Sequence, residues 1–224
     1  MHKILSAIAF VSIIIPWAVA QDNAAQPGNM PDKLPFCPPQ NCLYYAGDFD
    51  STSKGANGLA NANNQIDEAE VWVGVKPTQN ATITGATFNE FFTARGVGVN
   101  PTPFAVQVGI KEGQRGKTVC ATRGNAIERR YGESDFGYTQ YSYTIKKLRK
   151  ACTFNKGTLY FVNLLPTFDD GTTWAFLANV GPKAKNHQGW PNQPNRCFIN
   201  YPQAKQHYGK CSGEYSIALT GTEN

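Results

Sequence analysis

The run Leu159-Tyr160-Phe161-Val162-Asn163-Leu164-Leu165 decides the fold, because it is apolar on both of its alternating faces. A strand of this kind is buried from both sides, so it belongs at the centre of a sheet that a second layer covers. Gly157 and Thr158 precede it; Gly supplies a turn, and Thr and Tyr suit a pleated, half-buried surface. The run therefore predicts a core made of two packed layers.

Shorter runs on both sides of this segment alternate in polarity with a period of two, as strands with one buried face do. Their apolar faces are formed by Val71, Val73 and Val75; Phe104, Val106, Val108 and Ile110; Tyr141, Tyr143 and Ile145; Trp174, Phe176 and Ala178; and Tyr215, Ile217 and Leu219. Thr82 to Phe88 predicts a further strand with a bulge at Gly85. The candidates for short helices are Asn125 to Arg130 and Pro202 to His207.

About eight to ten strands with almost no helix predict an all-β fold: a two-sheet antiparallel β-sandwich or jelly roll. The chain has 224 residues, of which 12% are aromatic and 17% charged, which excludes a disordered tail and a coiled coil. Residues 42–224 are expected to form one domain. A flexible leader rich in Pro, Asn and Asp precedes it over residues 21–41.

Residues 1–20 predict a signal peptide. Lys3 precedes an apolar run from Ile4 to Ile15, and Ala18-Val19-Ala20 is the small-x-small pattern that a signal peptidase cleaves. The apolar run is shorter than the ~20 residues that span a bilayer. We therefore expect cleavage before Gln21 and a mature chain without a transmembrane segment, located outside the cell or in the periplasm.

Six cysteines lie beyond the predicted cleavage point, and an even count in an exported chain is typical of disulfides. Among the possible pairings we expect nearest neighbours to join: Cys37 with Cys42, Cys120 with Cys152, and Cys197 with Cys211. Zinc is the alternative. However, no Cys-x-x-Cys pair occurs, and His187 and His207 have no finger-like spacing to the cysteines. No metal site is therefore expected at these residues.

Five motifs follow one another within residues 43–221: Glu70-Val71-Trp72-Val73-Gly74-Val75-Lys76-Pro77, Ala81-Thr82-Ile83-Thr84-Gly85-Ala86, Val106-Gln107-Val108-Gly109-Ile110, Lys156-Gly157-Thr158-Leu159-Tyr160-Phe161-Val162 and Thr173-Trp174-Ala175-Phe176. Their order resembles a bacterial family of secreted β-sandwich domains found in exported proteins that are described by their choice of surface anchor. The chain departs from that pattern at residues 111–116, where Pro-Gly is usual. The resemblance implies the fold and export, and it carries over no catalytic residue.

Catalysis has weak support in the sequence. No Gly-x-Ser-x-Gly elbow accompanies His187 and His207 as a serine hydrolase would require. A glycoside-cleaving enzyme needs two carboxylates flanking one bond, and the candidates are Asp48, Asp50, Glu70, Glu90, Asp169, Asp170 and Glu214. Asp169-Asp170-Gly171 is, however, typical of a turn. We expect no catalytic residue and keep the glycoside-cleaving enzyme as an alternative.

Asp48 and Asp50 lie in an oxygen-rich segment, residues 48–58, whose ligands would suit a structural calcium ion. The segment fails the helix-loop-helix calcium pattern, because Ser53 stands where Gly is required and Leu59 where Glu is required. A solvated loop is the simpler interpretation, so no cofactor is expected.

The long C-terminal loop, residues 181–213, is the candidate ligand surface. Its aromatic, amide and cationic side chains can stack on sugar rings and hold hydroxyl or acidic groups; the candidates are His187, Trp190, Arg196, Tyr201, His207 and Tyr208. Alternatively, the loop is a disulfide-closed cover in which Trp190 and Tyr201 fill gaps. A net charge of +5 allows an acidic surface or an anionic polysaccharide as partner. Because the charge is diffuse along the sequence, no nucleic acid is expected.

These observations favour a secreted extracellular protein that binds a ligand, such as a glycan, or has a structural role without catalysis. The alternative is a carbohydrate-binding module or a carbohydrate-active enzyme on a jelly-roll scaffold.

The exported protein is expected to begin at Gln21 and to contain three disulfides. Mass spectrometry with alkylation before and after reduction measures both features, and all six cysteines should be alkylated only after reduction. A mass that retains residues 1–20, or alkylation without reduction, would contradict the prediction.

Overall fold

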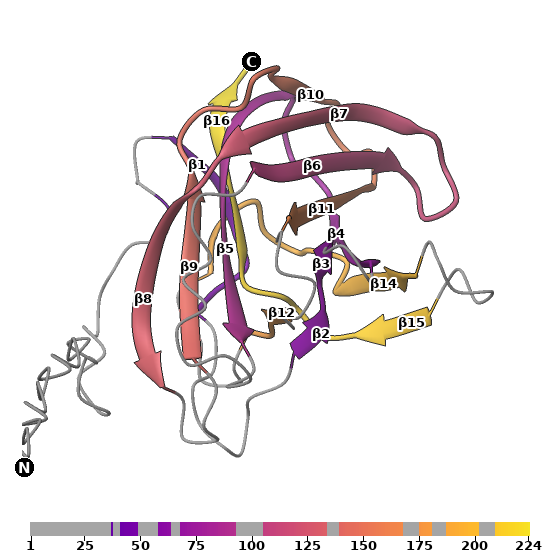
Figure 1. Ribbon diagram of the computed structural model, residues 1–224. Coiled ribbons are helices and arrows are strands. Elements are labelled where there is room, and N and C mark those ends of the chain that lie inside the picture. The colour runs from indigo at the N-terminus through magenta and orange to yellow at the C-terminus, as the bar shows by residue number, and fades with distance from the viewer. Residues whose placement is uncertain are drawn as a thin grey trace, which may run out of the picture.

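The computed structural model describes residues 37, 41–48, 58–63, 68–92, 105–133, 139–167, 175–180, 187–201 and 209–224. In these ranges the chain is all-β, and its strands form two antiparallel sheets packed against each other (Figure 1). The predicted two-sheet sandwich is therefore confirmed. No helix in the described ranges has the length and hydropathy needed to cross a membrane. The predicted signal peptide, and the predicted leader except for Cys37 and Asn41, lie outside them.

The first sheet is organised around β5 (Ala81–Phe92), which has two partners along each of its edges. One edge pairs with β16 (Ile217–Glu223) and β12 (Ala175–Ala178), and the other with β10 (Cys152–Phe154) and β9 (Thr139–Ile145). The remaining strands that the described residues contribute are β1 (Cys42–Tyr45), β2 (Gly58–Ala60), β8 (Ile127–Glu133) and β13 (Gln188–Gly189).

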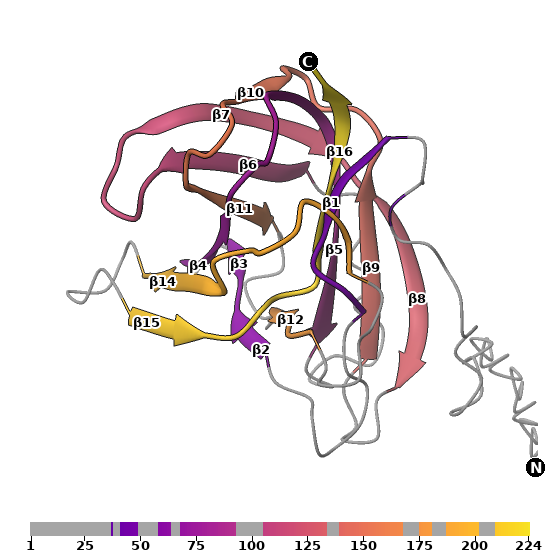
Figure 2. The same ribbon diagram turned by 180° about the vertical axis from the view of Figure 1, so that it is seen from behind.

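The second sheet has the order β15 (Gly209–Ser212), β14 (Arg196–Asn200), β4 (Glu68–Val75), β11 (Tyr160–Pro166), β6 (Ala105–Glu112) and β7 (Thr118–Asn125), with β3 (Ala62–Asn63) paired to β4. All seven residues of β11 are buried between its two neighbours, as the sequence predicts for the central strand. Strands of this sheet run across those of the first sheet in both views (Figures 1 and 2). The prediction of one long loop over residues 181–213 is wrong, because β13, β14 and β15 lie within it. The pairing of β13 with β1 and of β14 with β4 is long-range, so local sequence does not indicate these strands.

The chain passes from one sheet to the other where β7 ends and β8 begins. Only Ala126 separates the two strands, and Figure 1 shows them as one curved ribbon. The helix predicted for Asn125 to Arg130 is therefore wrong. From Ile127 to Glu133 the backbone pairs with β9, and these non-local hydrogen bonds outweigh the local preference. The other helix candidate, Pro202 to His207, lies outside the described residues.

The predicted inward faces of β4, β6, β9 and β16 are confirmed, since their described residues belong to one core cluster. The prediction for β12 is wrong. Ala175 and Leu177 enter the core, whereas Phe176 is half-buried. Leu177 pairs with Glu90, which also points between the sheets. This strand is apolar at every position, so alternation of polarity does not distinguish its two faces.

The bulge predicted at Gly85 is confirmed. Thr220 pairs with Gly85 and the next residue, Gly221, pairs with Ile83, which leaves Thr84 as the extra residue of β5. A Cβ atom on Gly85 would lie 2.6 Å from the carbonyl oxygen of Ile145. Glycine is therefore required by this close approach.

The three predicted disulfides are also confirmed: Cys37–Cys42, Cys120–Cys152 and Cys197–Cys211. The second joins β7 to β10 and so links the two sheets covalently. The third closes the β14–β15 hairpin at a directly opposed pair of residues. Loop closure of this kind stabilises a fold by about 2–4 kcal/mol per disulfide.

The side chain of Asn61 bridges β4 and β11 beyond Val162, where the backbone pairing of these two strands ends. Its side-chain Oδ1 accepts a hydrogen bond from Val71 N at 3.0 Å, and its Nδ2 donates to the carbonyl of Leu164 at 2.8 Å. Asn163 Nδ2 donates to the carbonyl of Val71 at 2.9 Å. These two buried amides supply the hydrogen bonds that the separated backbones need.

Asn61 also reaches the opposite sheet. Its Nδ2 lies 2.9 Å from Oε1 of Glu90 on β5, and the Glu90 side chain is only 1% exposed. Burial raises the pKa of the Glu90 carboxyl well above its ordinary value, and the hydrogen bond from Asn61 lowers it in part. The neutral carboxyl is therefore the form that the folded interior favours.

Replacing Asn61 with Ala is expected to lower the free energy of unfolding by about 3 kcal/mol or more, because several buried groups lose their partner. Asn125→Ala, at an exposed position of β7, is the matched control and should change it by less than about 0.5 kcal/mol. Urea denaturation measures both values. Equal effects would contradict the role of Asn61.

Replacing Glu90 with Gln should remove a pH dependence of stability. The pKa of Glu90 is higher in the folded state than its ordinary value of 4.5. Its stabilising contribution is therefore complete below that value and is lost as pH rises toward the folded-state pKa. Glu90→Gln should flatten this decline, whereas Glu112→Gln at an exposed site should not. The free energy of unfolding is measured against pH for the wild type and both variants. The same pH dependence in all three proteins would disprove the raised pKa of Glu90.

Candidate functional site

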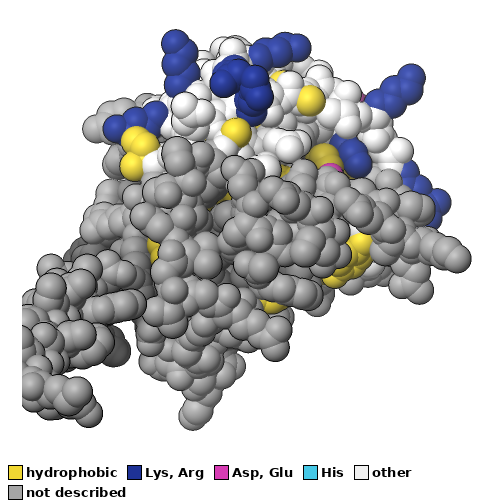
Figure 3. Space-filling model, viewed as in Figure 1, with side chains coloured by type: hydrophobic (Ala, Val, Ile, Leu, Met, Phe, Trp, Pro, Cys, Tyr) yellow, Lys and Arg dark blue, Asp and Glu magenta, His cyan; other side chains and the backbone are white. Residues whose placement is uncertain are grey.

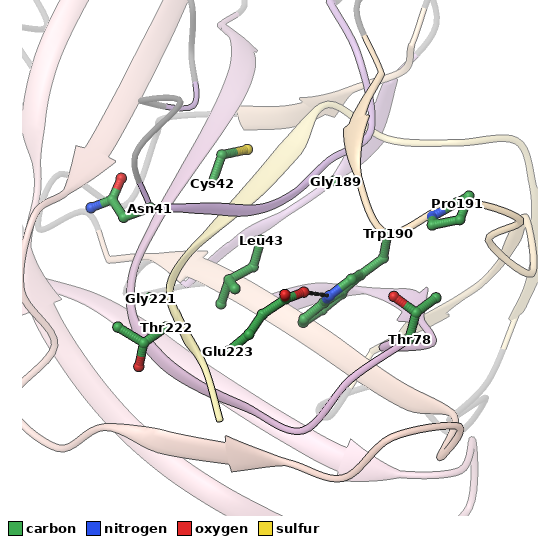
Figure 4. A pocket seen from close by; sticks show the side chains of 10 residues that line it. All are labelled: Asn41, Cys42, Leu43, Thr78, Gly189, Trp190, Pro191, Gly221, Thr222 and Glu223. Atoms are coloured by element: carbon green, nitrogen blue, oxygen red, sulfur yellow. Dashed lines mark hydrogen bonds between the residues drawn. The ribbon is translucent and has the colours of Figure 1, made fainter.

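A hollow of about 570 Å³ opens where β1 and β16 meet the residues that follow β13 (Figure 4). Ten residues from four parts of the chain line it: Asn41, Cys42, Leu43, Thr78, Gly189, Trp190, Pro191, Gly221, Thr222 and Glu223. The pairing of β1 with β16 brings the first and last of these segments together, and Gly221 N donates to the carbonyl of Asn41 at 2.9 Å.

Trp190 forms a fixed wall of this hollow. Its side chain is only 2% exposed, and its ring packs against Phe154 with 6.2 Å between the centroids. The indole Nε1 donates a hydrogen bond to Glu223 Oε1 at 3.0 Å, and Figure 4 shows the carboxylate turned toward the ring. The backbone N of Trp190 donates to the carbonyl of Leu43 at 3.1 Å. Trp190 is therefore held through both its side chain and its backbone.

Gly189 allows the chain to approach β1 closely. Its φ angle is +76°, and a Cβ atom at this position would lie 2.1 Å from the carbonyl oxygen of Leu43. Any other residue would push the wall of the hollow away from β1. The short strand β13, paired to Tyr44 and Tyr45, depends on this glycine.

Gln193 ties the same wall to the turn between β4 and β5. Its Oε1 accepts a hydrogen bond from Lys76 N at 2.8 Å, and its Nε2 lies 3.0 Å from the carbonyl of Trp190. Asn192 and Asn195 adopt positive φ angles of 54° and 45°, which asparagine tolerates better than most residues. The wall is thus held in place by contacts within the protein.

The exposed part of the lining is polar. Asn41 contributes an amide, Thr78 and Thr222 contribute hydroxyls, and Glu223 contributes a carboxylate. These groups can donate and accept hydrogen bonds to a ligand that carries several hydroxyls. Within the lining that is described, Glu223 is the one carboxylate. The described lining therefore offers both donors and acceptors of hydrogen bonds.

The structure places the predicted site residues on different elements. Trp190 lines the hollow, and the exposed His187 lies edge-on to the ring of Tyr44 at 5.8 Å. Arg196 begins β14 and Tyr201, 38% exposed, follows the end of that strand in the second sheet. His207 and Tyr208 lie outside the described residues.

The described carboxylates named as candidates for catalysis have structural contacts. Glu90 is buried between the sheets, while Oε2 of Glu70 accepts hydrogen bonds from Trp72 Nε1 and Asn200 Nδ2, each at 2.8 Å. Asp48 accepts a hydrogen bond from the hydroxyl of Tyr45. Glu214 lies outside the lining of the hollow. Asp50, Asp169 and Asp170 lie outside the described residues.

The structural calcium ion considered at Asp48 and Asp50 stays a prediction, because Asp50 lies outside the described residues. Across the ranges that are described, no group of three or more His, Cys, Asp or Glu side chains is arranged to hold a metal ion.

Sequence patterns did not point to Asn41, Thr78, Thr222 or Glu223. Each is a single polar residue in a turn or at the end of a strand, and such residues are common on any surface. The long-range pairing of β1 with β16 brings Asn41, Thr222 and Glu223 into one lining, and Gln193 ties the turn that carries Thr78 to the same wall. No local signal specifies either arrangement.

The chain matches no known protein family, curated protein or solved structure. The functional argument therefore depends on the geometry and chemistry of the residues themselves. Among these residues, those around Trp190 form a preorganised polar hollow.

Trp190→Ala is expected to lower the free energy of unfolding by about 3–5 kcal/mol, because it empties a buried aromatic site. Tyr201→Ala, at a position that is 38% exposed, should change it by less than about 0.5 kcal/mol. Chemical denaturation of the two variants measures the difference. Similar losses would show that Trp190 is not the packed wall described above.

Proposed function

We propose that this protein is an exported, non-catalytic binding domain that holds a carbohydrate in the hollow beside Trp190. The observation that carries the proposal is the polar lining of the hollow, in which Glu223 and Thr78 lie beside a fixed indole (Figure 4). Carbohydrates present many hydroxyls that need such directional partners. The indole itself is almost fully buried, so it fixes the wall of the hollow and orients Glu223 instead of stacking on the ligand.

The size and rigidity of the hollow support a small ligand. Its volume of about 570 Å³ lies within the ~300–1,000 Å³ common for small-molecule sites. Gln193 and the Trp190–Glu223 hydrogen bond hold its walls in place. A site formed before binding loses less entropy when the ligand enters.

The charge of the lining favours a neutral or amino sugar over an acidic one. Glu223 can accept hydrogen bonds from ligand hydroxyls through its carboxylate oxygens. The same charge repels a ligand that carries a carboxylate or sulfate. The ligand proposed for this hollow is therefore uncharged or positively charged.

The absence of catalysis in this proposal follows from the same lining. Cleavage of a glycosidic bond needs a pair of carboxylates at a defined separation across that bond. In the described lining, Glu223 supplies the one carboxylate, and Glu70 and Glu90 lie elsewhere. Binding is therefore the function that these groups support best.

Export belongs to the same proposal. Three disulfides are typical of proteins that fold in an oxidising compartment, outside the cytosol. The predicted signal peptide at residues 1–20 and the resemblance to secreted sandwich domains support the same location.

A glycan array with the mature protein tests the proposal. Glu223→Gln should weaken binding by about tenfold, because a charge-assisted hydrogen bond to the sugar is lost. Glu112→Gln removes the same charge at an exposed site outside the hollow and should leave binding unchanged. No bound glycan, or equal losses in both variants, would refute the proposal.

Thr78→Trp tests the location by filling the hollow. Thr78 is exposed and faces the opening near Trp190 (Figure 4), so an indole here should block entry without disturbing the core. Gln79→Trp, at the neighbouring exposed position outside the lining, is the matched control. Binding should be lost in the first variant and kept in the second, and melting temperatures should stay equal.

A further inference from the structure

Positive charge gathers along one edge of the sandwich. Residues 113–127 and 139–167 together contain eight Lys or Arg residues and no Asp or Glu. Because the whole chain carries a net charge of +5, the remainder of the chain is net negative. Figure 3 shows dark-blue side chains spread over the upper part of the described surface, with little magenta among them. The excess of positive charge is therefore carried by these two segments, which the net charge of the whole chain does not reveal.

The turn after β9 brings two of these segments together. Arg149 N donates a hydrogen bond to the carbonyl of Arg123 at 2.9 Å, and Lys150 N donates to Thr122 Oγ1 at 3.0 Å. Leu148, which is 4% exposed, packs into the core. The nearby Cys120–Cys152 disulfide joins the same segments covalently.

Five exposed cations lie on this fixed framework, and we call them the basic edge: Arg123, Lys146, Lys147, Arg149 and Lys150. Four of them surround the buried Leu148 on one short turn, and Arg123 lies beside them on β7. The backbone hydrogen bonds of Arg149 and Lys150 hold this turn against β7, so the five cationic side chains start from a fixed backbone.

Protection of an edge strand does not explain this pattern. Charges on an exposed strand block pairing with another chain, and Arg123 on β7 serves that purpose. The four cations of residues 146–150 lie outside any strand. Among the described residues, none of the five forms a salt bridge with a carboxylate. Like charges on one turn repel one another, and a polyanion would relieve that repulsion.

We propose that the basic edge binds an acidic polysaccharide through its sulfate or carboxylate groups. The alternative polyanion, a nucleic acid, is less suited to this surface. Single-stranded nucleic acids stack on exposed aromatic rings, and the large exposed apolar residues described on β7 and β8 are aliphatic, Val119 and Ile127. Duplex grooves are commonly entered by a helix or a two-stranded ribbon, whereas four of the five cations lie on a turn.

This proposal is independent of the carbohydrate proposed for the hollow. The two sites share no residue, and they carry opposite charge: Glu223 lines the hollow, whereas Lys and Arg form the basic edge. Loss of one activity is therefore expected to leave the other intact.

Binding of the mature protein to immobilised heparin and to polygalacturonate tests the proposal. Lys147→Gln/Arg149→Gln should weaken binding by about tenfold and reduce its dependence on salt, because ionic contacts are lost. Lys76→Gln/Arg196→Gln removes the same charge from exposed positions outside the basic edge and should have an effect below about twofold. Arg123→Gln, a single replacement within the basic edge, should also weaken binding to the two polysaccharides.

Three outcomes would overturn the proposal. The first is no binding of the wild-type protein to either polysaccharide at about 0.15 M salt. The second is an equal loss in the edge pair and the control pair, which would show that only net charge matters. The third is tighter binding to duplex DNA than to heparin, which would assign the edge to nucleic acid. Equal melting temperatures for all variants confirm that the replaced side chains are exposed.

Discussion

The side-chain amide of Asn61 hydrogen-bonds to both sheets, and the arrangement of the sandwich depends on it. It joins Val71 and Leu164 where β4 and β11 separate, and it also reaches Glu90 on β5. A buried amide is stable only when its donors and acceptors are paired, so these contacts define one relative position of the strands. Hydrophobic packing alone is less directional. The polar contact therefore adds specificity to a core that apolar burial stabilises.

Part of this architecture can be predicted from the sequence, because periodicity reports which side of a strand is buried. The faces of β4 and β6 and the central position of β11 follow from residue type and spacing, and the expected nearest-neighbour pairing of the six cysteines is also confirmed. Residues 127–133 do not, because their strand exists only through its partner β9. The face of β12 is ambiguous because the strand is apolar throughout. Long-range pairing decides both features.

In the candidate site, too, local sequence indicates some residues, whereas long-range pairing decides how they are arranged. Trp190 stands out in the sequence as an aromatic residue in a polar segment, but its environment cannot be inferred there. The fold buries the ring and leaves its polar edge to Glu223, which lies 33 positions away. The remaining lining comes from both ends of the domain and from one turn. A site assembled from four separate segments has no local sequence signature, so its chemistry becomes visible only in three dimensions.

The pairing of β1 with β16 also determines how the domain responds to mechanical force. The two strands are antiparallel, and Cys42, at the start of β1, pairs with Thr220, near the end of β16. Tension applied to the two ends of the domain would thus load the hydrogen bonds of this pair one after another, beginning at Gly221 and Asn41. Bonds broken singly resist less than bonds sheared together. The β1–β16 pair therefore resists tension weakly, whereas β16 stays paired with β5 along its other edge and the disulfide between β7 and β10 keeps the two sheets attached.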